Sequence, residues 1–221
     1  MISTPLVADA CIRCGVPLRA APAGIAPVTR GALVSGRALP TRHYGSVDVF
    51  LEALARAEPG DVLVIDNGGR VDESCIGDLT VLEAEAAGVA ALVVWGLHRD
   101  TAQLVEIGLP VFSYGTSPLG PTRLDARDEE PVRVGEHVVS RDDVVFADDD
   151  GVVFVAADRV GEVLAVARSI GDVEREQAAR IRAGETLRDQ TRFDEYLEQR
   201  AADPAYTFRA HLRRVGRAIE E

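Results

Sequence analysis

The chain has 221 residues, 47% of them hydrophobic and 27% charged, which is the balance of an ordinary folded domain. Its formal net charge of −12 argues against binding to nucleic acid or anionic membranes, so an anionic ligand would need a local arginine or a metal ion. The sequence shows neither a signal-peptide pattern nor an apolar run of about 18 residues, and we expect a cytoplasmic protein.

The first 60 residues predict two helices separated by short strands. Thr4-Pro5, followed by an apolar run through Ile12, indicates an opening helix with Thr4 as its N-cap. Residues 16–45 are rich in proline, glycine and alanine, which favours short strands joined by turns. Ser46 is expected to cap a second helix, which Pro59-Gly60 ends.

Residues 62–112 alternate between buried strands and helices. Continuous apolar runs predict strands at 62–65, 89–95 and 110–112. The segments between these runs predict helices that begin at Asp78 and just after Asp100. This order indicates a parallel α/β sheet.

Residues 132–155 change to short β runs separated by glycine and aspartate turns. Asp148-Asp149-Asp150-Gly151 predicts a tight hairpin. Three adjacent carboxylates could also bind Ca²⁺, but the further ligands of an EF-hand loop are missing. A long helix is expected after Asp158.

The last 38 residues are highly charged and amphipathic. Phe208, Leu212, Val215 and Ile219 form a narrow apolar stripe at helical spacing. We therefore divide the chain into a main domain, 1–183, and a C-terminal helical tail, 184–221. The stripe predicts packing either on a neighbouring subunit or on the chain's own domain.

Cys11 and Cys14 have the spacing of a CxxC pair, which could be a redox pair or half of a zinc site. A structural zinc site needs four ligands, and no second pair of ligands follows. The pair lies in a predicted helix, where buried cysteines are common, so we interpret both as reduced thiols.

Polar residues concentrate at two predicted strand ends, each of which opens a helix. These are Gly77-Asp78-Leu79-Thr80 and Arg99-Asp100. In parallel α/β sheets, ligands bind outside the carboxyl ends of the strands. The first-turn amides of Leu79 and Thr80 could hold a carboxylate.

The second segment adds charge to this arrangement. Arg99 offers a guanidinium suited to a carboxylate or an enolate oxygen. Asp100 is an oxygen ligand of the type that Mg²⁺ prefers. The alternatives are that each aspartate is only an N-cap and that the Arg-Asp pair is an ordinary surface feature.

Gly77-Asp78, then 20 residues, then Arg99-Asp100 resembles the GD-x20-RD signature of RraA-like proteins and of the related class II pyruvate aldolases, which cleave 4-hydroxy-4-methyl-2-oxoglutarate. The flanking segments 60–66 and 108–112 agree with this family. The resemblance covers about residues 1–170 and is strongest between 59 and 120.

The resemblance implies a swivelling β/β/α fold and a homotrimer or hexamer with active sites at subunit interfaces. It also implies a divalent cation, Mg²⁺ or Mn²⁺. The family's roles fall on Asp100 as the metal ligand and on Arg99 as the substrate-binding arginine. Asp78 would orient a metal-bound water.

The backbone contacts to the pyruvyl carboxylate fall on the helix opening, at Gly77, Leu79 and Thr80. The implied activity is a retro-aldol cleavage of a 4-hydroxy-2-oxo acid to pyruvate, or the decarboxylation of oxaloacetate. In either case the substrate is a small anionic 2-oxo acid. His98 could assist proton transfer or could simply be packed.

Three positions depart from the family pattern, and the last of them concerns recognition of the distal part of the substrate. Gln103 stands where many members carry an acidic residue, Trp95-Gly96-Leu97-His98 replaces a frequent Asp-Gly-Ala-Val, and Tyr114 replaces a frequent arginine.

Two other functions compete with the lyase. The first is a non-catalytic protein that binds and regulates an RNA-degrading enzyme, as some RraA relatives do. The second is a methyltransferase, suggested by residues 64–69, but the GxGxxG pattern opening directly into a helix is missing there.

Overall fold

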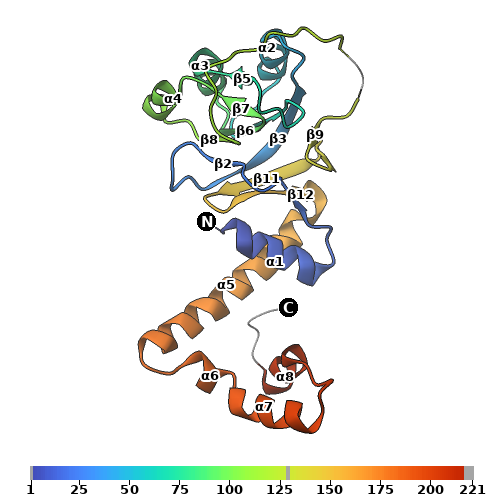
Figure 1. Ribbon diagram of the computed structural model, residues 1–221, viewed down its shortest axis with the longest axis vertical. Helices are drawn as coiled ribbons and strands as arrows, with labels where there is room; N and C mark the ends of the chain where they lie inside the picture. Colours follow the sequence, from blue (N-terminus) through green and yellow to red (C-terminus); the bar gives the residue numbers. More distant parts are fainter. Residues whose placement is uncertain (1, 128–129, 217–221) are drawn as a thin grey trace.

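The computed structural model describes residues 2–127 and 130–216. An α/β body lies at one end of the molecule, and three short helices lie at the other end, beyond the long helix α5 (Figure 1). We call the described part of the tail, residues 184–216, the C-terminal arm.

The helices of the body and of the connection to the arm are α1 (Thr4–Cys14), α2 (Asp48–Leu54), α3 (Asp78–Ala86), α4 (Thr101–Ile107), the 3-10 turn η1 (Ala157–Arg159) and α5 (Val160–Arg182). The arm contains α6 (Leu187–Gln190), α7 (Phe193–Ala202) and α8 (Phe208–Val215).

The main sheet has eight strands in the order β1-β12-β11-β3-β4-β6-β8-β2. Their bounds are β1 (Arg19–Ala20), β2 (Ala26–Pro27), β3 (Val34–Arg42), β4 (Val62–Asp66), β6 (Ala91–Trp95), β8 (Val111–Ser113), β11 (Asp143–Asp148) and β12 (Gly151–Ala156). Two small sheets pair β5 (Ser74–Ile76) with β7 (Leu97–His98), and β9 (Arg133–Val134) with β10 (His137–Val138).

Strand β3 joins the parallel half of the main sheet to the antiparallel half. Its residues 38–42 pair in parallel with β4, and its residues 34–37 pair antiparallel with β11. Strands β4, β6 and β8 continue the parallel half, as predicted for residues 62–112. The expectation of only short strands in residues 16–45 was wrong, because β3 runs through nine residues.

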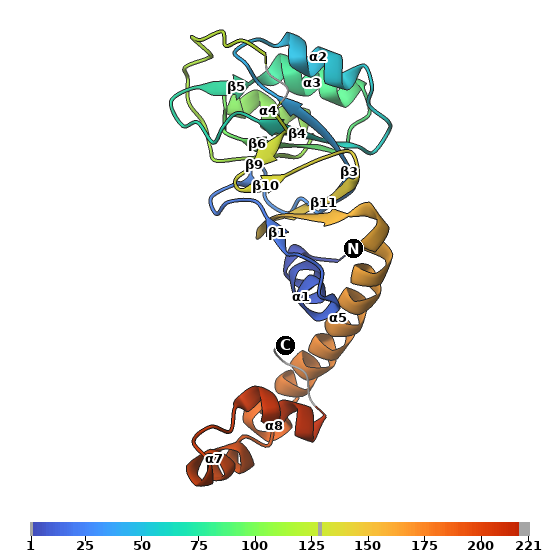
Figure 2. The same cartoon turned by 90° about the vertical axis from the view of Figure 1, so that its right-hand side faces the viewer.

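Alternation of side chains along the strands produces the layers of the body. Leu63 and Ile65 of β4 pack under α2, α3 and α4. Val62 and Val64 face the other way, into a core shared with Phe154 of β12. Figures 1 and 2 show α2–α4 on one side of the strands and α1 with α5 on the opposite side. This is the predicted mixed α/β fold with a C-terminal helical region.

The aspartate triplet forms the predicted hairpin and also fixes helix α1. Asp148 pairs with Gly151 across the turn. The Asp148 carboxylate accepts hydrogen bonds from the Thr4 amide at 2.7 Å and the Thr4 hydroxyl at 2.5 Å. Thr4 is the first residue of α1, and the N-cap is Ser3, one residue before the predicted position.

The C-terminal arm has its own small core. Phe208 of α8 packs against Phe193 and Tyr196 of α7, with ring centroids 5.5 and 5.0 Å apart. His211 is fully buried and lies 2.8 Å from the Thr191 carbonyl oxygen. Of the predicted stripe, Phe208 thus packs within the arm and Leu212 is buried, and Ile219 lies outside the described residues.

Two further expectations concern metals and membranes. Cys11 and Cys14 are free thiols on α1, and within residues 2–127 and 130–216 no group of three or more His, Cys, Asp or Glu side chains is placed to hold a metal. No helix in that part of the chain is long and apolar enough to cross a membrane.

Candidate functional site

A two-stranded sheet that the sequence did not predict brings the two polar segments together. Strand β5 pairs in parallel with β7, and the Arg99 amide donates a hydrogen bond to the Ile76 carbonyl at 3.0 Å. The carboxyl ends of both strands therefore lie at the same edge. Gly77-Asp78 leaves β5 there, beside Arg99-Asp100, which leaves β7.

Asp100 adopts a backbone conformation that is rare for a residue with a side chain. Its φ of 58° lies in the left-handed region, which typically costs about 1–3 kcal/mol. Asp100 occupies the N-cap position of α4, but its side chain makes no capping hydrogen bond. The carboxylate turns instead toward the other segment, where Oδ2 lies 3.4 Å from Arg99 Nε and 3.5 Å from the Asp78 amide nitrogen.

Gly77 is what allows this approach. A Cβ atom at position 77 would lie 2.3 Å from Asp100 Oδ2 and 3.2 Å from Arg99 Nε. The φ of Gly77 is −147°, an extended value that any residue adopts. Glycine is therefore required at position 77 because a side chain would collide with Asp100, and not because of its backbone conformation.

The opening of α3 differs in part from the predicted carboxylate cradle. The Leu79 amide donates a hydrogen bond to Asp78 Oδ1 at 2.8 Å, so one of the two predicted donors is already engaged. Within the described residues, the Thr80 amide has no acceptor. A ligand carboxylate would therefore have to share the Leu79 amide with the Asp78 carboxylate.

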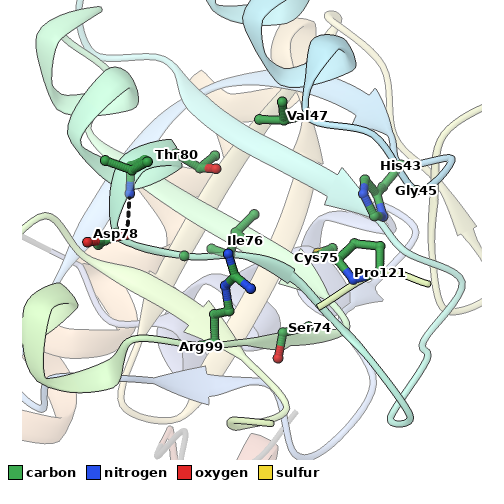
Figure 3. A pocket seen from close by; sticks show the side chains of 12 residues that line it. His43, Gly45, Val47, Ser74, Cys75, Ile76, Asp78, Thr80, Arg99 and Pro121 are labelled. Carbon is green, nitrogen blue, oxygen red and sulfur yellow. Dashed lines mark hydrogen bonds between the residues drawn. The ribbon is translucent and has the colours of Figure 1, made fainter. Parts of the chain in front are cut away.

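A cavity of about 300 Å³ lies at this edge (Figure 3). Five of the six residues singled out in the sequence line it, namely Gly77, Asp78, Leu79, Thr80 and Arg99. Asp100 does not line the cavity, but its carboxylate adjoins it beside Gly77 and Arg99. The Arg99 side chain is half exposed, and Asp100 is its one carboxylate partner in the described part of the chain.

The cavity is also lined by residues that were not singled out from the sequence, chiefly His43, Ser74, Cys75 and Pro121. His43 follows the last residue of β3, which is a parallel strand. Its position at a strand's carboxyl end was the available signal, but β3 was not recognised as a single strand.

Residues 117–127 form a strap that closes one side of the cavity. The Ser74 amide donates to the Leu119 carbonyl at 2.7 Å, and the Asp125 amide donates to the Tyr44 carbonyl at 2.8 Å. Between these two points, Arg123 Nε binds the buried carboxylate of Glu73 at 2.9 Å. These bonds hold Pro121 against the cavity.

His98 is a packed residue and does not line the cavity. Its Nδ1 lies 2.7 Å from Ser113 Oγ, and its Nε2 lies 3.0 Å from Thr101 Oγ1. Burial lowers the pKa of His98, and nearby Asp100 raises it by a smaller amount. Of the two roles considered for this histidine, the geometry supports packing.

The residues at this edge suit a magnesium ion better than zinc. Asp100 offers a partly exposed carboxylate beside a cavity, next to the space that the missing Cβ of Gly77 leaves open. Mg²⁺ is commonly held by one or two carboxylates together with waters and ligand oxygens. A structural zinc site would need four nitrogen or sulfur ligands, and the described residues bring no such set together.

Comparison with known proteins identifies the family. A family model for RraA-like proteins (Aldolase/RraA) matches residues 4–154. The chain belongs to the RraA-like family. This family includes both aldolases of the 4-hydroxy-4-methyl-2-oxoglutarate type and inhibitors of RNase E, so membership by itself leaves both activities open.

Individual RraA-like relatives resemble the chain over most of its length. The protein DlpA of Legionella pneumophila is 30% identical over 203 residues, which cover 87% of this chain but 32% of DlpA. This chain thus spans about a third of the length of that relative.

Two solved structures share the fold. An uncharacterized protein from Pseudomonas syringae pv. tomato superposes with a TM-score of 0.73 at 25% identity, over 84% of this chain and 90% of the other. RraAS2 of Streptomyces coelicolor, described as an unusual member of the RNase ES inhibitor RraA family, gives 0.68 at 28% identity, over 81% and 91%.

Proposed function

We propose that the protein is a divalent-metal-dependent lyase that cleaves a carbon–carbon bond of a 2-oxo acid. The observation that carries this proposal is the conformation of Asp100. A left-handed backbone turns its carboxylate away from its own helix, toward Arg99 and the edge of the cavity. Strain of this kind is concentrated at functional sites. Arg192, the N-cap of α7, also has a left-handed backbone, so the direction of the Asp100 carboxylate carries the proposal and not the strain alone.

The chain's own residues would bind and orient the substrate. The Thr80 amide, with the Leu79 amide beside it, would hold the substrate carboxylate at the start of α3. Arg99 would donate hydrogen bonds to the oxygen on C2, where negative charge develops when the C3–C4 bond breaks. Asp78 would position a water that takes and returns protons.

Asp100 would hold the divalent cation, Mg²⁺ or Mn²⁺, with waters and substrate oxygens completing its coordination. When bound, the cation would supply Lewis-acid polarisation of the 2-oxo group. The same charge stabilisation serves the retro-aldol cleavage of a 4-hydroxy-2-oxo acid and the decarboxylation of oxaloacetate. A small anionic substrate is also compatible with the net charge of −12, because Arg99 and the cation offset it locally.

The test is a screen of 2-oxo acids with pyruvate release as the readout, in Mg²⁺ and again in EDTA, with protein-free samples at the same Mg²⁺ concentration subtracted. We expect Mg²⁺-dependent release that falls about 10²–10³-fold in Arg99→Ala and is lost in Asp100→Ala. Asp158→Ala, an exposed aspartate far from the cavity, is the matched control. Full activity in EDTA would overturn the metal's role.

A second candidate is supported by the similarity to RraAS2, which belongs to a family of RNase ES inhibitors. In this function the acidic surface would bind an RNA-degrading enzyme, and the cavity would have no catalytic role. A pull-down with an RNase E-type enzyme separates the two proposals. Capture that is unchanged by Arg99→Ala, in a protein that releases no pyruvate, would favour the inhibitor.

We also propose that the protein assembles as a homotrimer or hexamer. Two of the residues that line the cavity, Leu79 on α3 and Val47 before α2, have exposed apolar side chains, and Leu51 on α2 is also exposed. Such a patch is typical of an interface. Light scattering coupled to size-exclusion chromatography tests this directly, and a monomer at micromolar concentration would contradict it.

A further inference from the structure

His43 lies in the cavity wall and is held by contacts on several sides. The residue is only 3% exposed. Its ring stacks on Phe50 of α2, with centroids 5.3 Å apart and planes inclined by 12°. Its Nδ1 lies 2.9 Å from Oδ1 of Asn67. Little freedom remains for the imidazole to rotate.

The hydrogen bonds around Asn67 define the tautomer of His43. Arg123 Nη2 donates to Asn67 Oδ1 at 3.0 Å, which identifies that atom as the amide oxygen. An amide oxygen only accepts, so the hydrogen bond from His43 requires a proton on Nδ1. Nε2 then carries a lone pair, and it has no hydrogen-bond partner among residues 2–127 and 130–216.

The surroundings favour the neutral ring. Burial is the largest influence and lowers the pKa of His43, and the positive charge of Arg123 lowers it further. The hydrogen bond to Asn67 and the carboxylates of Glu73 and Asp125 act in the opposite direction and are smaller. At neutral pH the lone pair on Nε2 is therefore available to accept a proton.

Few other groups in the cavity can take a proton. Ser74 Oγ lies 2.7 Å from the His98 carbonyl oxygen and 2.6 Å from the Ser117 carbonyl oxygen, so its hydroxyl is engaged. Burial raises the pKa of Cys75 far above its usual value, which keeps the thiol protonated. Asp78 and His43 remain, and Figure 3 shows them at opposite ends of the cavity with Arg99 between them.

We propose that His43, in place of the water positioned by Asp78, is the base that takes the proton of the C4 hydroxyl when this site cleaves a 4-hydroxy-2-oxo acid; the water at Asp78 keeps the return of a proton to the enolate. The inference rests on the proposed function and on this arrangement. With the substrate carboxylate at the α3 end and its C2 oxygen at Arg99, C4 points toward the end where His43 lies.

The proton and electron movements balance without a further reactant. Nε2 takes the hydroxyl proton, and the O–H electron pair forms the C4 carbonyl. The C3–C4 bond breaks, and its electron pair forms the C2–C3 double bond of the enolate while the C2 oxygen takes the negative charge. C3 of the enolate then takes a proton from the water at Asp78, and the protonated His43 gives its proton back to water, so no net proton is gained or lost. The product leaves as pyruvate, and the C4 fragment leaves as an aldehyde or a ketone.

The test compares two reactions in the same site, the cleavage of a 4-hydroxy-2-oxo acid and the decarboxylation of oxaloacetate. Only the cleavage needs a base for a hydroxyl proton. In His43→Gln, the ratio of cleavage kcat to decarboxylation kcat is expected to fall about 10²-fold, since general-base catalysis is worth about 10²–10⁴-fold. The KM for the hydroxy acid is expected to change little. His137→Gln, a histidine on β10 outside the cavity, serves as the matched control.

A pH profile gives a second readout. The cleavage rate of the wild type is expected to fall when the pH is lowered through the lowered pKa of His43, because the protonated ring cannot act as a base. In His43→Gln this decrease of the rate at acidic pH should be absent. The charged groups that line the two hollows bordered by His43 are Arg42, Arg70, Asp78, Arg99, Arg123 and Asp125, with Glu73 behind Arg123.

The third readout is independent of turnover. Nitrogen-15 NMR of histidine-labelled protein, with the His43 signal assigned by its loss in His43→Gln, should show a neutral ring protonated on Nδ1. A ring protonated on Nε2, an unchanged reaction ratio, or an equal fall of both reactions would overturn the role of His43. A wild type that performs neither reaction overturns the proposed function and this inference with it.

Discussion

In the α/β body the buried side chains are mainly valine, leucine, isoleucine and alanine on strands, whereas the arm is held by aromatic rings, a buried histidine and ion pairs. The body's cores continue from one strand to the next through alternate residues. The arm's core consists of a few rings around Tyr196, His211 and Phe208. α5 is the helix that connects the two regions (Figure 2).

The body can hold side chains in fixed positions better than the arm can. The candidate site lies at the edge of a sheet that is buried on both sides, so its backbone is fixed by many hydrogen bonds at once. The arm contacts itself more than the body, and regions with few buried apolar contacts open at lower free energy. We therefore expect chemistry in the body and association or regulation in the arm.

The largest expected effect concerns the independence of the two cores. Phe112 of β8 is fully buried, and Phe112→Ala should lower the free energy of unfolding of the body by about 3–5 kcal/mol. Tyr196→Ala, in the arm, should melt α7 and α8 and leave the main transition in place. Chemical denaturation, with hydrogen exchange to locate the opening, measures both. If Tyr196→Ala lowered the main transition as much as Phe112→Ala, the two regions would be one cooperative unit.

A smaller effect comes from adding the same methyl group at the candidate site and on the connecting helix. In Gly77→Ala the new Cβ meets Asp100 Oδ2, which should displace the carboxylate and lower turnover on the order of 10²-fold while the fold is kept. Gly161→Ala, in α5, meets nothing within 4 Å and should stabilise the helix by about 0.5–1 kcal/mol. Steady-state kinetics and thermal unfolding are measured on both variants. Full turnover in Gly77→Ala would refute the close packing of the two segments.

The smallest effect tests the start of the arm. Thr186 and Asp189 form a reciprocal capping box at α6. Thr186→Ala should destabilise this turn locally by about 1 kcal/mol. Amide exchange within residues 187–200 should accelerate while exchange in β4 and β6 stays the same. Faster exchange in the strands would show that the arm supports the body.

Much of the body could be predicted from sequence because its signals are local. The apolar runs at 62–65 and 89–95 and the aspartate hairpin each depend on neighbouring residues, and each was observed at its predicted place. The resemblance to the RraA-like family implied that Gly77-Asp78 and Arg99-Asp100 belong to one site, and the structure brings Gly77 and Asp100 together.

The parts that were not predicted depend on contacts between residues far apart in the chain. The pairing of β5 with β7 has no strong local pattern, since each strand is only two or three residues long. The left-handed backbone of Asp100 is not visible from its neighbours in sequence. His43 enters the cavity because Asn67, Arg123 and Phe50 position it, and these residues lie on three separate segments.

The most direct test of a single site at Arg99 and Asp100 is the binding of oxalate, measured by calorimetry. The two carboxylates of oxalate resemble the enolate of pyruvate. We predict that the wild type binds oxalate in Mg²⁺ but not in EDTA, that Arg99→Ala and Asp100→Ala each weaken binding about 30-fold or more, and that Asp158→Ala binds as the wild type does. Oxalate binding that is equal in all four proteins, or absent from the wild type in Mg²⁺, would contradict a single site formed by Arg99 and Asp100.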